Sequence, residues 1–113
     1  MWGAMIRLAI PMVLALSSAA SAGTVTGQVK FLTVREADNL HYVVIEGVET
    51  GRPSCAAATN YLMIKNEDSN TGRSQFASLL SAKISGTPVT IIGAGTCTRW
   101  GDGEDINSVI LNP

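Results

Sequence analysis

The N-terminal segment constrains this chain most, because its pattern is that of a segment removed during export. Arg7 precedes an apolar run over residues 8–16, and only small residues follow up to Ala22. This order is typical of a secretory signal peptide, and Ala20 with Ala22 supplies the small-residue pair that precedes a cleavage site. We therefore predict that residues 1–22 are a signal peptide, cleaved between Ala22 and Gly23.

An uncleaved membrane anchor is the alternative interpretation of this segment. Its nine apolar residues, interrupted by Pro11, fall short of the roughly 20 needed to cross a bilayer. No later apolar run is long enough to span, so we expect no membrane span after cleavage. Residues 23–113 show no repeat and no linker. We expect them to form one domain, secreted or periplasmic.

The charge pattern disfavours nucleic acid as a partner. Residues 23–113 contain seven Lys or Arg and nine Asp or Glu, which gives a net charge of −2. Proteins that bind nucleic acid gather basic residues on one face, because neutralising phosphates supplies much of the affinity. The seven basic residues here are scattered singly along the chain.

The two cysteines, Cys55 and Cys97, both lie after the predicted cleavage site. Export takes them to a compartment where disulfides form and persist, so we predict a Cys55–Cys97 disulfide. Closing a loop of roughly 40 residues would add about 4 kcal/mol of stability in the chain-entropy model. A zinc site needs more ligands than these two and the single His41 supply. We expect neither a metal nor a cofactor.

Hydrophobic periodicity predicts five strands and one helix. The strands are expected at residues 24–34, 41–45, within 54–64, 89–92 and 106–111. Residues 65–72 have the composition of an exposed loop. The helix is expected from about Arg73 to Ser85 and ends at Gly86. Its core-facing side is predicted to comprise Phe76, Leu79, Leu80 and Ile84.

This element order, β-β-β-α-β-β, predicts a mainly β fold with one helix. It is the order of the five-stranded Greek-key barrel of the oligonucleotide/oligosaccharide-binding (OB) type. In that fold we expect the helix to close one end of the barrel. An open α+β sandwich built from the same elements is the alternative.

Few side chains suggest chemistry. Residues 102, 104 and 105 are three carboxylates, but a calcium loop needs ligands at alternate positions over a longer stretch. Ile106 and Ser108 break that pattern, so we expect a solvated turn there. His41 stands alone in a polar turn without a recognisable nucleophile motif, and no catalytic residues are predicted. Trp100 is either a platform for a ligand or a cap over the core. Gly93 to Gly95 is expected to be a tight passage next to Cys97.

Several short segments resemble a known family. They are Thr26-Gly27-Gln28-Val29, residues 42–47, the Cys55-Ala56 pair, residues 76–80 and residues 85–91. Together they resemble the receptor-binding B subunits of the subtilase cytotoxin and typhoid toxin group. The ending Gly93-Ala94-Gly95-Thr96-Cys97-Thr98-Arg99-Trp100-Gly101-Asp102 is similar to small uncharacterised exported bacterial proteins.

The toxin resemblance implies a ligand and two contact residues. B subunits of that group form pentameric rings that bind cell-surface glycans, and a hydroxyl residue before the first-strand glycine contacts sialic acid. Thr26 stands at that position, and Glu46 matches a carboxylate at the end of the second strand. The aromatic-rich stretch that follows the fourth strand in those subunits is absent here, and the cysteine pattern differs.

These observations lead to two main functional hypotheses, which belong to different classes of protein. The first is a non-catalytic binding module, a homo-oligomer that recognises a glycan or a protein surface, with Thr26, Glu46 and Trp100 as ligand-binding residues. The second is a structural or accessory protein of the cell envelope that binds another exported protein. A small hydrolase is a third, weaker hypothesis.

Overall fold

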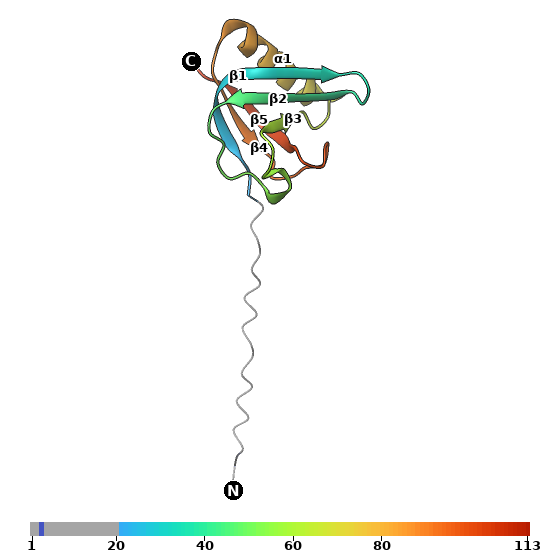
Figure 1. Cartoon of the computed structure of the whole chain (residues 1–113), viewed down its shortest axis with the longest axis vertical. Coiled ribbons are helices and arrows are strands. Elements are labelled where there is room, and N and C mark those ends of the chain that lie inside the picture. The colour runs from blue at the N-terminus through green and yellow to red at the C-terminus, as the bar shows by residue number, and fades with distance from the viewer. Residues whose placement is uncertain (1–2, 4–20) are drawn as a thin grey trace.

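The computed structural model describes residue 3 and residues 21–113 (Figure 1). The predicted signal peptide lies outside the described residues, except for Gly3, Ser21 and Ala22. Seven elements follow in chain order. They are β1 (Thr24–Arg35), β2 (Leu40–Glu46), a 3₁₀ turn (Ser54–Ala56), β3 (Tyr61–Met63), α1 (Asn70–Ser85), β4 (Val89–Gly93) and β5 (Glu104–Leu111).

The five strands form a closed barrel in the order β1-β2-β3-β5-β4. All neighbouring pairs are antiparallel except β3 and β5, which run parallel at Leu62–Glu104 and Met63–Asp105. The predicted OB-like barrel is thus confirmed. The open sandwich is wrong, because the short parallel pairing of β3 with β5 joins the two edges that a sandwich would leave free.

The long first strand serves two neighbours. Residues 24–27 of β1 pair with β4, and residues 28–35 pair with β2 (Figure 1). The change of partner falls at Gly27, where a Cβ atom would collide with the carbonyl of Glu46. Only glycine lets the two backbones approach this closely. The bulge itself lies further along β1, between Val29 and Phe31.

Alternate residues of the strands supply the core. Val25 and Val29 of β1 point inward with Val43 and Ile45 of β2, as the period of two requires. The remaining buried core residues are Leu62, Ile64, Leu79, Ala82, Val89, Ile91 and Ile106. Helix α1 covers one end of this core, as expected (Figure 1).

Helix α1 starts earlier than predicted and buries a different face. The Ser69 hydroxyl accepts a hydrogen bond from the Gly72 N–H, which caps the helix and extends it into the stretch predicted to be a loop. Gly86 ends it in the left-handed conformation, as expected. Leu79 is buried, but Ile84 is 80% exposed and Leu80 is 41% exposed.

The predicted core face of α1 was therefore wrong at two of its four positions. The buried helix residues are instead Gly72, Gln75, Leu79 and Ala82. Two of these four residues, Gly72 and Ala82, are small, which lets the helix lie close against the barrel end. Gln75 is accommodated there because its amide donates to the Asn107 carbonyl of β5.

The predicted disulfide is present between Cys55 and Cys97. It ties the 3₁₀ turn to the loop between β4 and β5, across 42 positions of sequence. Within the described part of the chain, no helix is long and apolar enough to cross a membrane.

Replacing both cysteines with serine is expected to lower the free energy of unfolding by about 4 kcal/mol, because the unfolded chain then gains loop entropy. Urea denaturation of residues 23–113 at pH 7 measures this loss. An unchanged unfolding midpoint would contradict a stabilising role for the disulfide.

Candidate ligand-binding face

Two adjacent carboxylates at the start of β5 organise one end of the barrel. Glu104 and Asp105 are both fully buried. The prediction of a solvated turn was therefore wrong for these two residues. Trp100, Gly101 and Asp102 are exposed at the turn, whereas Gly103 is buried. A buried carboxylate is costly unless hydrogen bonds satisfy it, and both side chains meet this condition with donors from the chain around them.

Asp105 is surrounded by donors from the preceding loop. Its carboxylate accepts from the hydroxyls of Thr96 (2.7 Å) and Thr98 (2.6 Å), and from the N–H groups of Thr98 (3.0 Å) and Arg99 (3.1 Å). Burial alone would raise the pKa of this carboxyl, but the hydrogen bonds outweigh it and lower the pKa. Asp105 is thus held ionised and fixes the backbone of residues 96–99.

Glu104 makes the corresponding contacts on the other side of the strand. Its oxygens accept from the N–H groups of Gly95 (2.9 Å) and Gly23 (3.0 and 3.2 Å). A Cβ at position 93 would overlap the Glu104 carboxyl group. The predicted tight passage at Gly93 to Gly95 is therefore the space into which this carboxylate fits.

Further contacts hold the loop between β4 and β5, residues 94–103, against the barrel. The Arg99 guanidinium donates to both oxygens of Glu67 (3.1 Å each) and to the Asp38 carbonyl (2.9 Å). Burial raises the pKa of Glu67, but the hydrogen bonds from Arg99 and from backbone N–H groups bring it below its ordinary value. The Thr59 hydroxyl donates to the Asp102 carbonyl at 2.5 Å. Together with the disulfide, these contacts make the 94–103 loop a fixed structure.

The fixed loop places Trp100 beside two tyrosines of the barrel wall. Tyr42 of β2 and Tyr61 of β3 have ring centroids 5.7 Å apart. The Arg35 guanidinium lies 5.0 Å from the centroid of the Trp100 ring. We call Tyr42, Tyr61, Trp100 and Arg35 the aromatic patch. They line one hollow of about 90 Å³, with the buried Leu40 and Met63 beneath.

Polar groups border this patch. Arg35 forms two hydrogen bonds with the Asp38 carboxylate (2.5 and 3.0 Å), and the Tyr61 hydroxyl donates to Asp102. The hollow is smaller than the enclosed pockets of about 300 Å³ or more that bury small ligands. A ligand would therefore lie across the patch rather than sink into it.

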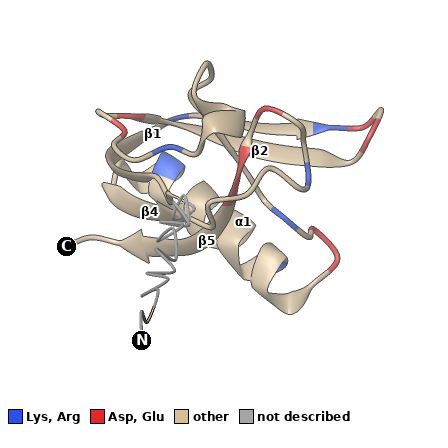
Figure 2. Ribbon diagram, turned by 90° about the horizontal axis from the view of Figure 1, so that it is seen from below, with Lys and Arg blue, Asp and Glu red and all other residues tan. Residues whose placement is uncertain are grey.

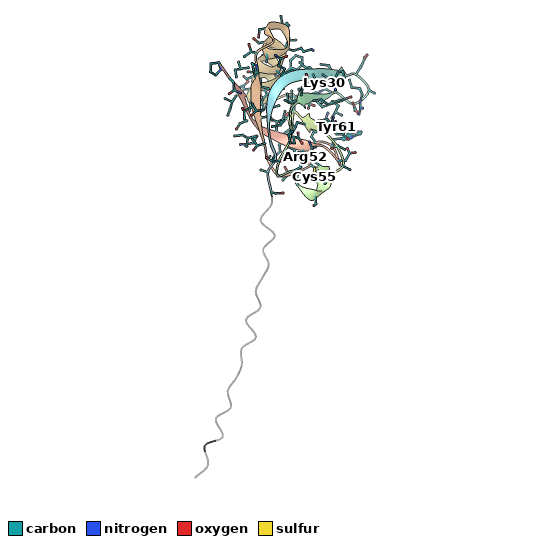
Figure 3. All side chains as sticks on the ribbon, turned by 60° about the vertical axis from the view of Figure 1, so that its left-hand side comes forward. Lys30, Arg52, Cys55 and Tyr61 are labelled. Carbon is teal, nitrogen blue, oxygen red and sulfur yellow. A yellow bond between two sulfur atoms is a disulfide. The ribbon has the colours of Figure 1, made fainter. Side chains whose placement is uncertain are left out.

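The patch occupies the part of the barrel that OB folds use for ligands. In those folds, oligonucleotides and oligosaccharides bind on strands 2 and 3, between the loops that follow strands 1 and 4. Here Tyr42 and Tyr61 come from β2 and β3, Arg35 ends β1 and Trp100 lies in the 94–103 loop. Figure 3 shows Tyr61 on this wall of the barrel.

Of the predicted ligand-binding residues, only Trp100 belongs to the patch, where it is 39% exposed. Thr26 and Glu46 lie near each other, because a Cβ on Gly47, the residue after Glu46, would lie 2.3 Å from the Thr26 carbonyl oxygen. Both are exposed, and the Thr26 hydroxyl is hydrogen-bonded to that of Thr90 at 2.8 Å. Nine positions of β1, about 30 Å of strand, separate Thr26 from Arg35, so the structure does not bring the three residues into one site.

Sequence reasoning missed Arg35, Tyr42 and Tyr61. Tyr42 and Tyr61 lie within the predicted strand ranges 41–45 and 54–64, where the pattern predicts a strand and no site. The sequence does contain a signal for the tyrosine pair, since both are amphipathic aromatic residues in strands predicted to follow one another. Their position beside Trp100 could not be predicted, because it depends on the path of the 94–103 loop, which tertiary contacts determine.

The structure gives no support for a catalytic base or a metal site among the described residues. His41 is half-buried rather than on the surface: its ring packs edge-on against Phe76, and Nδ1 lies 3.0 Å from the Asn39 carbonyl. Among the described residues, no Ser, Thr or Cys side chain is hydrogen-bonded to that ring. No group of three His, Cys, Asp or Glu in the described part of the chain is arranged to hold a metal ion.

Comparison with known proteins assigns this chain to no family and to no function. No family model, no curated protein and no solved structure matches this chain. The functional interpretation therefore depends on the barrel and on the aromatic patch.

The Asp105 cluster leads to a stability prediction. Asp105→Asn is expected to lower the free energy of unfolding by about 1 to 3 kcal/mol at pH 7, because an amide cannot accept all four hydrogen bonds. Since the pKa of Asp105 is lowered by folding, its contribution is present above the unfolded-state pKa of about 3.9 and disappears as the pH falls through the folded value. The difference between the two proteins should therefore shrink below pH 4.

Urea denaturation at pH 7 and pH 3 measures this difference, with Asp68→Asn as the matched control. Asp68 is exposed, and its substitution should change stability by less than about 0.5 kcal/mol. Equal unfolding midpoints for Asp105→Asn and Asp68→Asn at pH 7 would contradict the role given to Asp105.

Proposed function

We propose that residues 23–113 form a non-catalytic binding module of an exported protein, and that it binds a glycan across the aromatic patch. The observation that carries this proposal is the position of Tyr42, Tyr61 and Trp100 on the ligand face of an OB-like barrel. Aromatic rings suit sugars, because their flat apolar faces pack against the C–H groups of a pyranose while nearby polar groups bind its hydroxyls.

The polar border of the patch supports a sugar ligand. The Asp102 and Asp38 carboxylates accept hydrogen bonds from hydroxyls, and the Arg35 guanidinium donates them. Because Arg35 is already paired with Asp38, the patch has little positive charge left to attract an anion. These groups favour a neutral glycan here. A sialylated ligand is what the toxin resemblance implies at Thr26.

The charge distribution supports a glycan over the other OB ligand class. Figure 2 shows Lys and Arg dispersed around the ribbon and interspersed with Asp and Glu. A path for a nucleic-acid backbone needs a row of basic side chains. The Cys55–Cys97 disulfide supports an oxidising location, which is where a protein exported by the predicted signal peptide would work.

The exposed side of α1 favours a second function, binding to another exported protein. Leu80 and Ile84 lie one helical turn apart and both are exposed. Apolar side chains in such a pair suit a protein partner better than a sugar. In this second function, α1 would carry the interface and the aromatic patch would have no role.

A glycan array with the purified 23–113 domain tests the first function. The domain is expected to bind a subset of glycans, and Trp100→Ala is expected to weaken that binding at least tenfold, because the largest ring of the patch is lost. Phe31→Ala is the matched control, since Phe31 is an exposed aromatic residue of β1 outside the patch. It should bind as the parent does.

Thr26→Ala distinguishes the two glycan sites. Retained binding by this variant, with loss in Trp100→Ala, supports the patch. Loss in Thr26→Ala with retention in Trp100→Ala contradicts it and favours the site that the resemblance implies. Failure of the parent to bind any glycan contradicts the glycan-binding function altogether.

A further inference from the structure

The N–H group at the predicted cleavage point is hydrogen-bonded to a buried carboxylate. Gly23 is buried, whereas Ser21 and Ala22 before it are exposed. Its nitrogen lies 3.0 Å and 3.2 Å from the two carboxylate oxygens of Glu104. The chain thus passes from the surface to the interior at the Ala22–Gly23 bond, beside a fully buried acidic side chain.

The surroundings fit glycine alone at this position. A Cβ at position 23 would lie 2.5 Å from an oxygen of Glu104 and 3.3 Å from the Arg52 side chain. The Gly23 carbonyl in turn accepts from the Gly93 N–H at 2.8 Å. Residue 23 is therefore held on both of its backbone polar groups, and no side chain separates its nitrogen from the carboxylate.

The charges at this end of the barrel do not balance. Glu49 and Glu104 supply two carboxylates, and Arg52 supplies one guanidinium that binds Glu49 and also donates to Thr59 and two backbone carbonyls. Figure 3 shows Arg52 at the end of the barrel where residues 21–23 enter. Among residues 21–113, no Lys or Arg side chain forms an ion pair with Glu104.

The neighbouring Glu49 carboxyl is affected by the same charges. Burial is the main cause that raises its pKa, the hydrogen bond and charge of Arg52 lower it, and the charge of Glu104 makes the smallest contribution, raising it. A buried carboxylate with only neutral donors is stabilised less than one with a cationic partner. A second positive group at this place would therefore stabilise the folded state.

We propose that the missing positive group is the new N-terminus: after cleavage between Ala22 and Gly23, the α-ammonium of Gly23 binds the buried Glu104 carboxylate as an ion pair. A peptide N–H has one hydrogen, which the two oxygens of Glu104 now share. An ammonium has three hydrogens and a full charge, so each oxygen receives its own charge-assisted hydrogen bond. Removing the signal peptide would thereby complete the fold as well as release the protein. This inference rests on the predicted export and cleavage.

The test compares two chains that differ by one residue. One begins at Gly23 and the other at Ala22. The Ala22 chain has the same net charge and is the matched control, because its ammonium lies outside the barrel. In urea denaturation at pH 6.5, where an α-amino group is protonated, the equilibrium constant for unfolding should be at least tenfold smaller for the Gly23 chain. In a Glu104→Gln background the two chains should differ by less than twofold.

A chemical readout covers the case in which Glu104→Gln does not fold. The α-amine of the Gly23 chain should react with an acylating reagent at pH 7 at least tenfold more slowly in the native state than in urea. The Ala22 chain should react at similar rates in both. Equal stability of the two chains, equal labelling rates, or an exported protein whose mass gives another N-terminus would each overturn the proposal. None of these readouts involves glycan binding. A failure of the proposed ion pair can therefore be distinguished from a failure of the proposed glycan-binding function.

Discussion

The pair of buried carboxylates at the start of β5 is the constraint on which the rest of the structure depends. Glu104 and Asp105 stand where β5 pairs with β3 and closes the barrel. Their oxygens collect N–H and hydroxyl groups from residues 23, 95, 96, 98 and 99. These two side chains thus hold together residue 23 just before β1, residue 95 just after β4, and residues 96–99 of the loop that follows. Burying them is favourable only because every one of these donors is in place.

This constraint links the fold to the candidate binding face. The 94–103 loop has no regular secondary structure of its own between β4 and β5, yet Asp105, the disulfide and Arg99 fix it at successive positions. Trp100 follows directly and packs under Arg35 beside the tyrosines of β2 and β3. A ring held in this way loses little conformational entropy when a ligand binds. The proposed glycan site therefore owes its preorganisation to the hydrogen bonds of buried Asp105, to the Arg99–Glu67 ion pair and to the disulfide.

Local patterns in the sequence were enough to predict the strands, the helix end at Gly86 and the disulfide, because each depends on neighbouring residues or on the compartment. The face of α1 was predicted wrongly at two positions, since apolar spacing favours Leu80 and Ile84, while the helix instead buries Gly72, Gln75 and Ala82 beside Leu79. The acidic stretch was also predicted wrongly at Glu104 and Asp105. Their glycine neighbours suggest a solvated turn, and the donors that bury them come from segments distant in sequence. For the same reason Trp100 was identified, but its tyrosine partners were not.

The most direct test of the glycan site uses the fact that Trp100 is the single tryptophan in residues 23–113. Its indole N–H gives one resonance in an NMR spectrum of the ¹⁵N-labelled domain. Titration with a glycan that the domain binds should shift this resonance saturably, together with amides of the 94–103 loop. Saturable shifts confined to residues around Thr26 and Glu46, with the Trp100 resonance unmoved, would contradict the account.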